Sequence, residues 1–194
     1  MSGWIEVITG GMFSGKTEEL LRRVRRAQFA KQEVQVLTAG IDSRYGHNII
    51  ASHNGIKCDA ISLSCDDPWE ILDILNPRVM VVGIDEVQFF ANGMIDVCEE
   101  MACAGIRVVV AGLNLDALGR SFGSMPELLA RADHITTLNA ICVKCGGLAS
   151  RTQLLLHGKP VPWQEGPLIL IGGENEGYEA RCRACHEVPG DHKN

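Results

Sequence analysis

The chain has 194 residues, of which 46% are hydrophobic, and this is enough for one main domain with a core of its own. Its formal net charge of -6 argues against a general nucleic-acid-binding protein, and no apolar run approaches the ~20 residues of a membrane span. A strand is expected almost at the first residue, so we expect no signal peptide and a cytoplasmic protein.

Near its start the chain carries the phosphate-binding pattern G-x-x-x-x-G-K-[ST]. A strand is expected before it, at residues 4–8, and a helix after it, at residues 18–32. In that setting backbone N–H groups and the helix N-terminus bind phosphate oxygens. Lys16 would reach the terminal phosphates, and the Thr17 hydroxyl would bind Mg²⁺. The residues of this predicted P-loop are Gly10, Gly11, Met12, Phe13, Ser14, Gly15, Lys16 and Thr17.

Strands and helices are expected to alternate along the next part of the chain. The run at residues 79–84 is continuously apolar, which indicates a strand buried on both faces and hence a parallel sheet. Further strands are expected at 34–38, 107–111 and 134–138, and helices at 66–75, 92–104 and 126–132. A polar loop at 42–46 falls at the ligand-binding edge, and a hairpin turn is expected at 52–55. The pattern predicts an α/β fold with a doubly wound, mainly parallel sheet.

Two carboxylates, Asp85 and Glu86, follow the apolar run directly. Buried charges must be paired, so their position at a strand end calls for a reason, and the P-loop supplies one. Asp85 suits a second Mg²⁺ ligand, and Glu86 suits the base that positions or deprotonates the attacking group. The alternative is an acidic end of the strand that simply faces solvent.

The chain changes character at residue 140, where two C-x-x-C pairs begin. Four thiolates suit a closed tetrahedral Zn²⁺ site of structural type, with His186 as an alternative to Cys185. A redox dithiol is the other interpretation. The pairs are Cys142 with Cys145, and Cys182 with Cys185. We therefore expect a P-loop α/β domain at 1–139, a β-rich zinc-binding flap at 140–189 with strands at 153–156 and 168–171, and a tail at 190–194.

Together these motifs resemble the thymidine kinases of type II, the class of the human cytosolic enzyme and most bacterial ones. The resemblance runs from about residue 3 to 189. It rests on the P-loop, the segments at 42–45 and 84–90, Phe122-Gly123, the two C-x-x-C pairs, and Ile171-Gly172-Gly173 with Tyr178.

The resemblance implies a role for each matching position. Glu86 corresponds to the general base for the deoxyribose 5′-hydroxyl, and the ATP and Mg²⁺ site would add Asp85 and Gln88 to the P-loop. The nucleoside site would contain Met12, Phe89, Leu113 and Phe122, together with Leu170, Ile171, Gly172 and Tyr178 of a closing flap called the lasso. The family is commonly a homotetramer inhibited by thymidine triphosphate.

The sequence thus predicts an ATP-dependent thymidine kinase that forms dTMP in pyrimidine salvage, with ATP, Mg²⁺ and structural Zn²⁺. Asn114, Ala117 and Asn139 depart from the family pattern near the expected nucleoside pocket. A deoxynucleoside kinase with another base preference is therefore one alternative. A P-loop ATPase that uses Glu86 to orient water is a second, and a non-enzymatic zinc-ribbon module is a third.

Overall fold

The main body of the protein is a six-stranded sheet in which every pair of neighbours is parallel. A computed structural model describes residues 3–40, 49–51, 57–163 and 176–190. The strand order is β5-β2-β6-β7-β1-β8. The strands are β1 (Trp4–Gly10), β2 (Val34–Ala39), β5 (Ile61–Leu63), β6 (Val81–Asp85), β7 (Arg107–Gly112) and β8 (His134–Leu138). The first strand of the chain thus lies between two late ones, β7 and β8.

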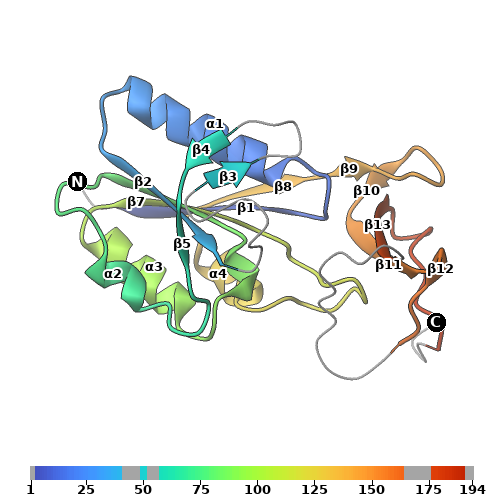
Figure 1. Ribbon diagram of the computed structural model, residues 1–194. Coiled ribbons are helices and arrows are strands. Elements are labelled where there is room, and N and C mark those ends of the chain that lie inside the picture. Colours follow the sequence, from blue (N-terminus) through green and yellow to red (C-terminus); the bar gives the residue numbers. More distant parts are fainter. Residues whose placement is uncertain (1–2, 41–48, 52–56, 164–175, 191–194) are drawn as a thin grey trace.

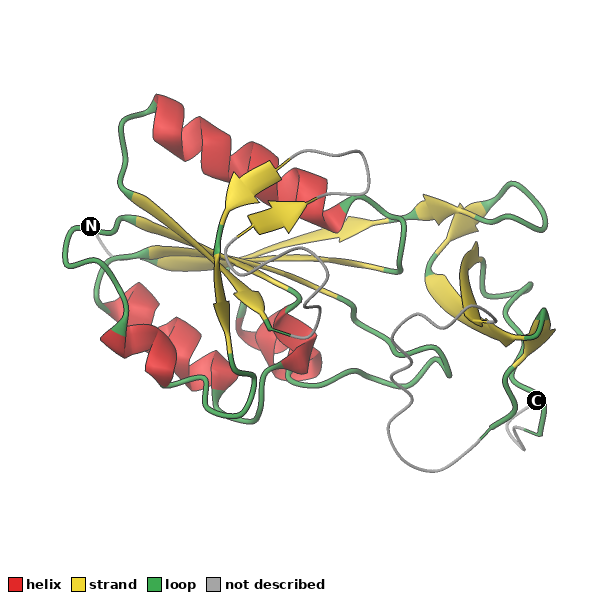
Figure 2. Ribbon diagram, viewed as in Figure 1, coloured by secondary structure: helices red, strands yellow, loops and turns green. Residues whose placement is uncertain are grey.

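Helices cover both faces of this sheet, which confirms the doubly wound arrangement. α1 (Lys16–Phe29) lies on one face, and α2 (Glu70–Asp73), α3 (Met94–Cys103) and α4 (Met125–Arg131) lie on the other (Figure 1, Figure 2). Two separate core clusters correspond to the two faces. β6 and β7 contribute alternate residues to both clusters, as the continuous apolar runs predict for strands buried on both sides.

Two predicted helix boundaries are wrong. Only residues 70–73 of the helix expected at 66–75 are α-helical. The turns around them have hydrogen bonds of 3-10 type, in which an N–H bonds to the carbonyl three residues earlier, such as Leu72 N–H to Trp69 O. The helix after the P-loop ends at Phe29 instead of residue 32. There Lys31 takes a left-handed conformation with φ of 60°, and the Gln32 N–H bonds back to Ala27 O.

A second, smaller group of strands follows β8 and lies beyond the C-terminal ends of the main strands (Figure 1). β11 (Arg151–Leu156) pairs antiparallel with β12 (Lys159–Pro160) and with β13 (Glu176–Arg181). β9 (Ala140–Ile141) and β10 (Leu148–Ala149) form a short hairpin. We call the part from β9 to residue 190 the C-terminal unit. Its β-rich character agrees with the prediction, while the boundaries at 139 and 189 stay predictions.

Several expected features lie outside the described residues. These are the polar loop at 42–46, the turn at 52–55, the strand at 168–171 and the tail. β3 (Ile49–Ala51) and β4 (Lys57–Asp59), which flank residues 52–56, do pair antiparallel. Among the described residues, no helix is both long enough and apolar enough to cross a membrane.

Candidate active site and metal centre

The P-loop follows β1 and takes the strained backbone conformation that the motif requires. Gly10 has a φ of 151° and Gly15 a φ of 85°, and a Cβ at Gly10 would come 2.2 Å from the carbonyl oxygen of Leu138. Phe13, a non-glycine residue, has a φ of 64°. Such conformations persist only where the surroundings fix them, and they gather at functional sites. The loop leads directly into the N-terminus of α1, where anions bind.

Lys16 is buried at the start of α1 and folds back over the loop. Its Nζ donates a hydrogen bond of 2.9 Å to the carbonyl oxygen of Gly11, and the residue is 9% exposed. Burial lowers the pKa of Lys16, and the charges of Glu86 and Asp85 offset this only in part. The hydroxyl of Ser14 also donates to Gly11 O, at 2.8 Å. The loop therefore holds its cation inside the protein, next to two carboxylates.

Asp85 joins the end of β6 to the P-loop. The hydroxyl of Thr17 donates to Asp85 Oδ2 at 2.9 Å, and the N–H of Glu86 donates to Asp85 Oδ1 at 3.0 Å. Asp85 is 4% exposed. Burial, together with the neighbouring charge of Glu86, raises the pKa of Asp85 to about 7. The structure thus brings together two groups, 68 positions apart, that the sequence singled out as Mg²⁺ ligands.

Glu86 lies directly after β6 and has a left-handed backbone, with φ of 56° and ψ of 37°. It precedes the 3-10 turn η2 (Val87–Phe89). Its Oε2 accepts a hydrogen bond of 2.5 Å from Nε2 of Gln88, and Oε1 of Gln88 accepts one of 3.0 Å from the N–H of Leu113. Gln88, expected to bind the cofactor, thus uses both ends of its amide within the protein.

Hydrophobic residues expected around the nucleoside lie at the same edge of the sheet. The rings of Phe89 and Phe122 pack edge to face, with centroids 5.2 Å apart. Tyr178 packs against a small cluster that contains Ala117. Met12 follows Gly11 in the P-loop. Leu170, Ile171 and Gly172 lie outside the described residues.

Two buried side-chain oxygens between β7 and α4 lack a hydrogen-bond partner in the part of the chain that the structure describes. They are Oγ of Ser124, which directly precedes α4, and Oδ1 of Asn114, in the loop after β7. A buried acceptor normally receives a hydrogen bond, because leaving it unpaired costs about 1–3 kcal/mol. The amide of Asn114 therefore suits a donor on a bound molecule.

The C-terminal unit contacts the P-loop through a residue that the sequence did not single out. The hydroxyl of Thr152, on β11, accepts a hydrogen bond of 3.0 Å from the N–H of Met12. Thr152 is 3% exposed. Nothing in the local sequence marks it, because its partner lies 140 positions away. The second group of strands therefore contacts the P-loop directly.

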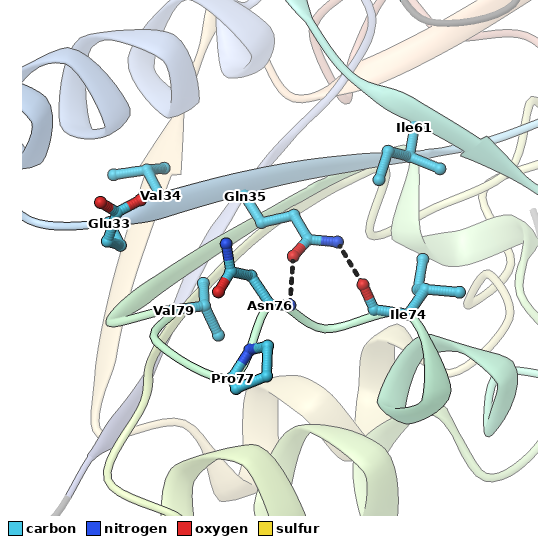
Figure 3. A pocket seen from close by; sticks show the side chains of 8 residues that line it. All are labelled: Glu33, Val34, Gln35, Ile61, Ile74, Asn76, Pro77 and Val79. Carbon is cyan, nitrogen blue, oxygen red and sulfur yellow. Dashed lines mark hydrogen bonds between the residues drawn. The ribbon is translucent and has the colours of Figure 1, made fainter.

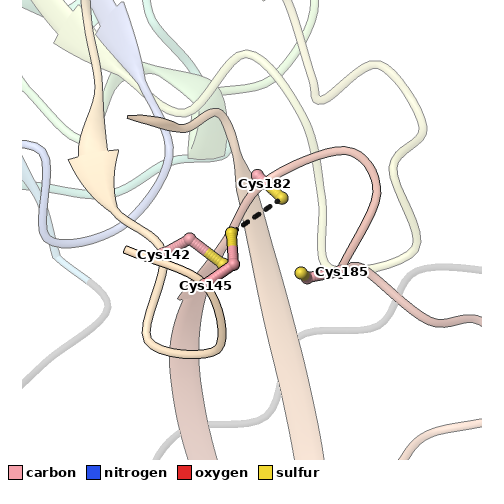
Figure 4. Close-up of side chains that lie close together, drawn as sticks. All are labelled: Cys142, Cys145, Cys182 and Cys185. Carbon is pink, nitrogen blue, oxygen red and sulfur yellow. Dashed lines mark hydrogen bonds between the residues drawn. The ribbon is translucent and has the colours of Figure 1, made fainter. Parts of the chain in front are cut away.

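The four cysteines of the two C-x-x-C pairs converge at the base of the C-terminal unit (Figure 4). Their sulfur atoms all lie within 4.8 Å of one another, and Cys145 Sγ is 3.7 Å from Cys182 Sγ. Burial would raise the pKa of Cys142, but hydrogen bonds from backbone N–H groups lower it to about 6, toward the thiolate form. His186 points elsewhere, and its Nε2 lies 2.9 Å from Ala117 O. The cluster is a four-cysteine set that suits Zn²⁺.

One groove on the described surface is remote from these residues. It has a volume of about 540 Å³ and lies near the N-terminal ends of β2 and β6, at the opposite edge of the sheet (Figure 3). The amide of Gln35 spans part of it, with hydrogen bonds to Ile74 O and from Asn76 N–H. It contains none of the expected site residues, and its polar groups are occupied by these structural bonds.

The chain is similar to a known protein family. The family model described as "Thymidine kinase" matches residues 3–186. Among solved structures, the Holliday junction branch migration motor RuvB of Thermotoga maritima is similar over 73% of this chain, with 15% sequence identity and a TM-score of 0.39. The matched region spans 39% of the length of that motor.

Proposed function

The chain belongs to the thymidine kinase family, whose members are phosphotransferases that phosphorylate thymidine, and we propose how its own residues carry out that reaction. The γ-phosphoryl group of ATP would pass to the 5′-hydroxyl of thymidine. The observation that carries this proposal is the meeting of the P-loop hydroxyl of Thr17 with the carboxylate of Asp85, next to Glu86. Phosphate, metal and base functions thereby share one edge of the sheet.

At the phosphate end, the P-loop N–H groups and Lys16 would bind the triphosphate. The hydroxyl of Thr17 and the carboxylate of Asp85 are oxygen ligands 2.9 Å apart, a donor set that suits Mg²⁺. When bound, Mg²⁺ neutralises charge on the transferring phosphoryl group. Lys16 would then exchange its bond to Gly11 O for phosphate oxygens, and its burial would strengthen that attraction.

At the acceptor end, Glu86 would take the proton of the 5′-hydroxyl and hold the oxygen in line. Met12, Phe89, Leu113, Phe122 and Tyr178 would surround the base. The unpartnered amide oxygen of Asn114 supports a hydrogen-bond donor of the nucleoside at that position. Which nucleoside is preferred follows from this pocket.

The four cysteines would hold a structural Zn²⁺. A tetrahedral site with Zn–S bonds of ~2.3 Å sets the sulfur atoms about 3.8 Å apart. The separation of 3.7 Å between Cys145 Sγ and Cys182 Sγ fits this value. Bound Zn²⁺ would link the β9–β10 hairpin to the chain after β13, and so hold the C-terminal unit in shape. The resemblance further implies a homotetramer inhibited by thymidine triphosphate, which light scattering and inhibition assays would test.

Replacing Glu86 with Gln tests the base assignment. We expect Glu86→Gln to leave the KM for ATP nearly unchanged and to lower kcat by about 10²–10⁴-fold, the usual contribution of a positioned base. Glu100→Gln on the exposed face of α3 is the control and should keep full activity. Turnover close to wild type in Glu86→Gln would contradict the role of Glu86.

A panel of acceptors tests the alternatives. ATP consumption is compared with thymidine, deoxyuridine, deoxycytidine and no acceptor. Consumption that depends on thymidine supports the proposal. Equal consumption without acceptor would identify an ATPase, and a preference for another nucleoside would identify a related kinase with altered base preference.

A further inference from the structure

Glu86, the proposed catalytic base, has a left-handed backbone conformation. Glu86 has a φ of 56°, although side chains disfavour this region, and Asp85 receives its N–H at 3.0 Å. The chain turns sharply here, from the end of β6 into η2. A side chain on such a turn needs a second contact to fix its direction, because the backbone alone leaves its rotamers free.

Gln88 supplies that contact through its side-chain amide. The orientation of this amide follows from its second partner, the backbone of Leu113. Gln88 is 2% exposed. One end of its amide faces the backbone N–H of Leu113 at 3.0 Å, and since an N–H only donates, this end must be the oxygen Oε1. The other end is therefore the NH₂ group, and it donates to Oε2 of Glu86 at 2.5 Å.

Two glycines make room for this glutamine. A Cβ at Gly112 would lie 2.6 Å from Oε1 of Gln88, and a Cβ at Gly123 would lie 2.1 Å from its main-chain oxygen. Real Cβ atoms do not approach so closely, so side chains at either position would displace Gln88. The loop after β7 is thus shaped around this residue on both sides.

We infer that Gln88 is a positioning residue that fixes the catalytic carboxylate of Glu86, through an amide bridge from the backbone of Leu113. This inference rests on the proposed function, because it needs Glu86 as the base. The bridge holds Oε2 of Glu86 and leaves Oε1 to meet the acceptor hydroxyl. It also ties the turn after β6, which bears the base, to the loop that carries Leu113 and Asn114 of the acceptor pocket.

Two single variants test the bridge. Gln88→Met keeps length and apolar volume but loses both hydrogen bonds. Gln88→Glu keeps the bond from Leu113 but sets a carboxylate against Glu86. We expect both to lower kcat by about ten- to a hundredfold, a part of the contribution of a positioned base, with the KM for ATP within about threefold of wild type. Gln153→Met, a buried glutamine of the C-terminal unit that bonds the backbone of Glu187, is the matched control. Gln153→Met should leave kcat within about threefold of wild type, which would show that replacing any buried glutamine does not by itself lower kcat.

A double-mutant cycle separates positioning from a structural role. If Gln88 acts through Glu86, then adding Gln88→Met to Glu86→Gln should lower the residual kcat by less than about threefold. The same cycle in urea unfolding should show coupling between the two side chains. An equal loss of kcat in both backgrounds would overturn the inference, and so would normal kcat in both Gln88 single variants. Wild-type turnover in Glu86→Gln would instead refute the proposed base, and the bridge with it.

Discussion

Asp85 is an acidic side chain that the fold buries almost completely, and its carboxylate accepts hydrogen bonds from one hydroxyl and one backbone N–H. Its folded pKa of about 7 lies above the value of ~3.9 for an unfolded chain. Its contribution to stability is therefore fully present below about pH 4 and is lost as the pH rises through about 7. A bound cation would remove this penalty, so the site is arranged for a ligand at the expense of the free protein.

We expect Asp85→Asn to stabilise the metal-free protein while it abolishes efficient phosphoryl transfer. At pH 8 the gain should be about 1–3 kcal/mol, or roughly 2–10 °C in Tm, because the amide carries no buried charge. Its oxygen can keep the bond from Glu86 N–H, and its NH₂ group can donate to the Thr17 oxygen, which reverses that bond. Thermal unfolding from pH 5 to pH 8 measures this, and the gain should shrink toward pH 5. The exposed Asp73→Asn serves as the control. A lower Tm for Asp85→Asn across the whole range would contradict the explanation.

The sequence predicted which candidate residues lie at one edge of the sheet better than it predicted their contacts. Thr17 and Asp85 were paired correctly, because a P-loop and a strand-end carboxylate meet at the same edge of any parallel sheet. The amide bridge of Gln88 could not be foreseen, since its partner Leu113 lies 25 positions away on another loop. The bond from Met12 to Thr152 depends on how a separate group of strands docks, which no local pattern encodes.

At the level of secondary-structure elements, one buried carboxylate holds four of them together. Glu6 on β1 accepts hydrogen bonds from Trp4, from Arg23 on α1 and from Arg107 on β7. Arg23 also reaches Thr136 on β8, at 2.7 Å. Burial would raise the pKa of Glu6, but the bonds from Arg107, Trp4 and Arg23 outweigh it and lower the pKa.

We expect Glu6→Gln to destabilise the protein by about 2–3 kcal/mol, since it leaves Arg107 without its carboxylate and Arg23 with only Glu19. A depressed pKa contributes stability above the unfolded value of ~4.3, and this is lost as the pH falls below it. The difference from wild type in urea unfolding should therefore be full at pH 7 and shrink below about pH 4. Glu99→Gln breaks an exposed pair with Arg131 and should cost less than ~1 kcal/mol. Equal costs for the two variants would count against this network.

The hydrophobic pattern predicted the strands and helices correctly where their side chains pack in the core. β6 and β7 were predicted because sheets buried on both faces demand continuous apolar runs. The helix expected at 66–75 is shorter, at Glu70–Asp73, because local hydrogen bonds compete with helical ones on both sides of it. The carboxylate of Asp67 accepts the N–H of Trp69 at 3.0 Å, and the amide of Gln35 ties down Asn76. Pro68 fits these tight turns as well as it fits the first turn of a helix.

For the molecule as a whole, the important feature is how the C-terminal unit attaches to the main sheet. Besides Thr152 at the P-loop, His186 contacts Ala117 O, and the guanidinium of Arg120 stacks on the ring of Trp163 at 5.4 Å. All of these partners in the main body lie in loops at the C-terminal edge of the sheet. His186 directly follows the last cysteine of the four-sulfur cluster. The proposed metal is thus one residue away from a contact with the active-site loop.

We expect Cys142→Ser to lose stoichiometric zinc and to lower the Tm by more than about 5 °C, because structural zinc sites contribute folding energy directly. Metal analysis and thermal unfolding measure the two effects, and proteolysis should then cut within residues 140–190. Cys103→Ser changes an exposed cysteine outside the cluster and should retain its zinc. Full zinc content in Cys142→Ser would contradict the four-cysteine site.

The position of β1 between β7 and β8 has a consequence for how the protein is made. Ribosomes deliver the P-loop strand first, yet both of its neighbours in the sheet come from residues 107–138. The nascent chain therefore cannot complete its ATP-binding loop until most of the polypeptide has left the exit tunnel. During that delay β1 has neither of its sheet neighbours, and an unpaired apolar strand of this kind favours aggregation.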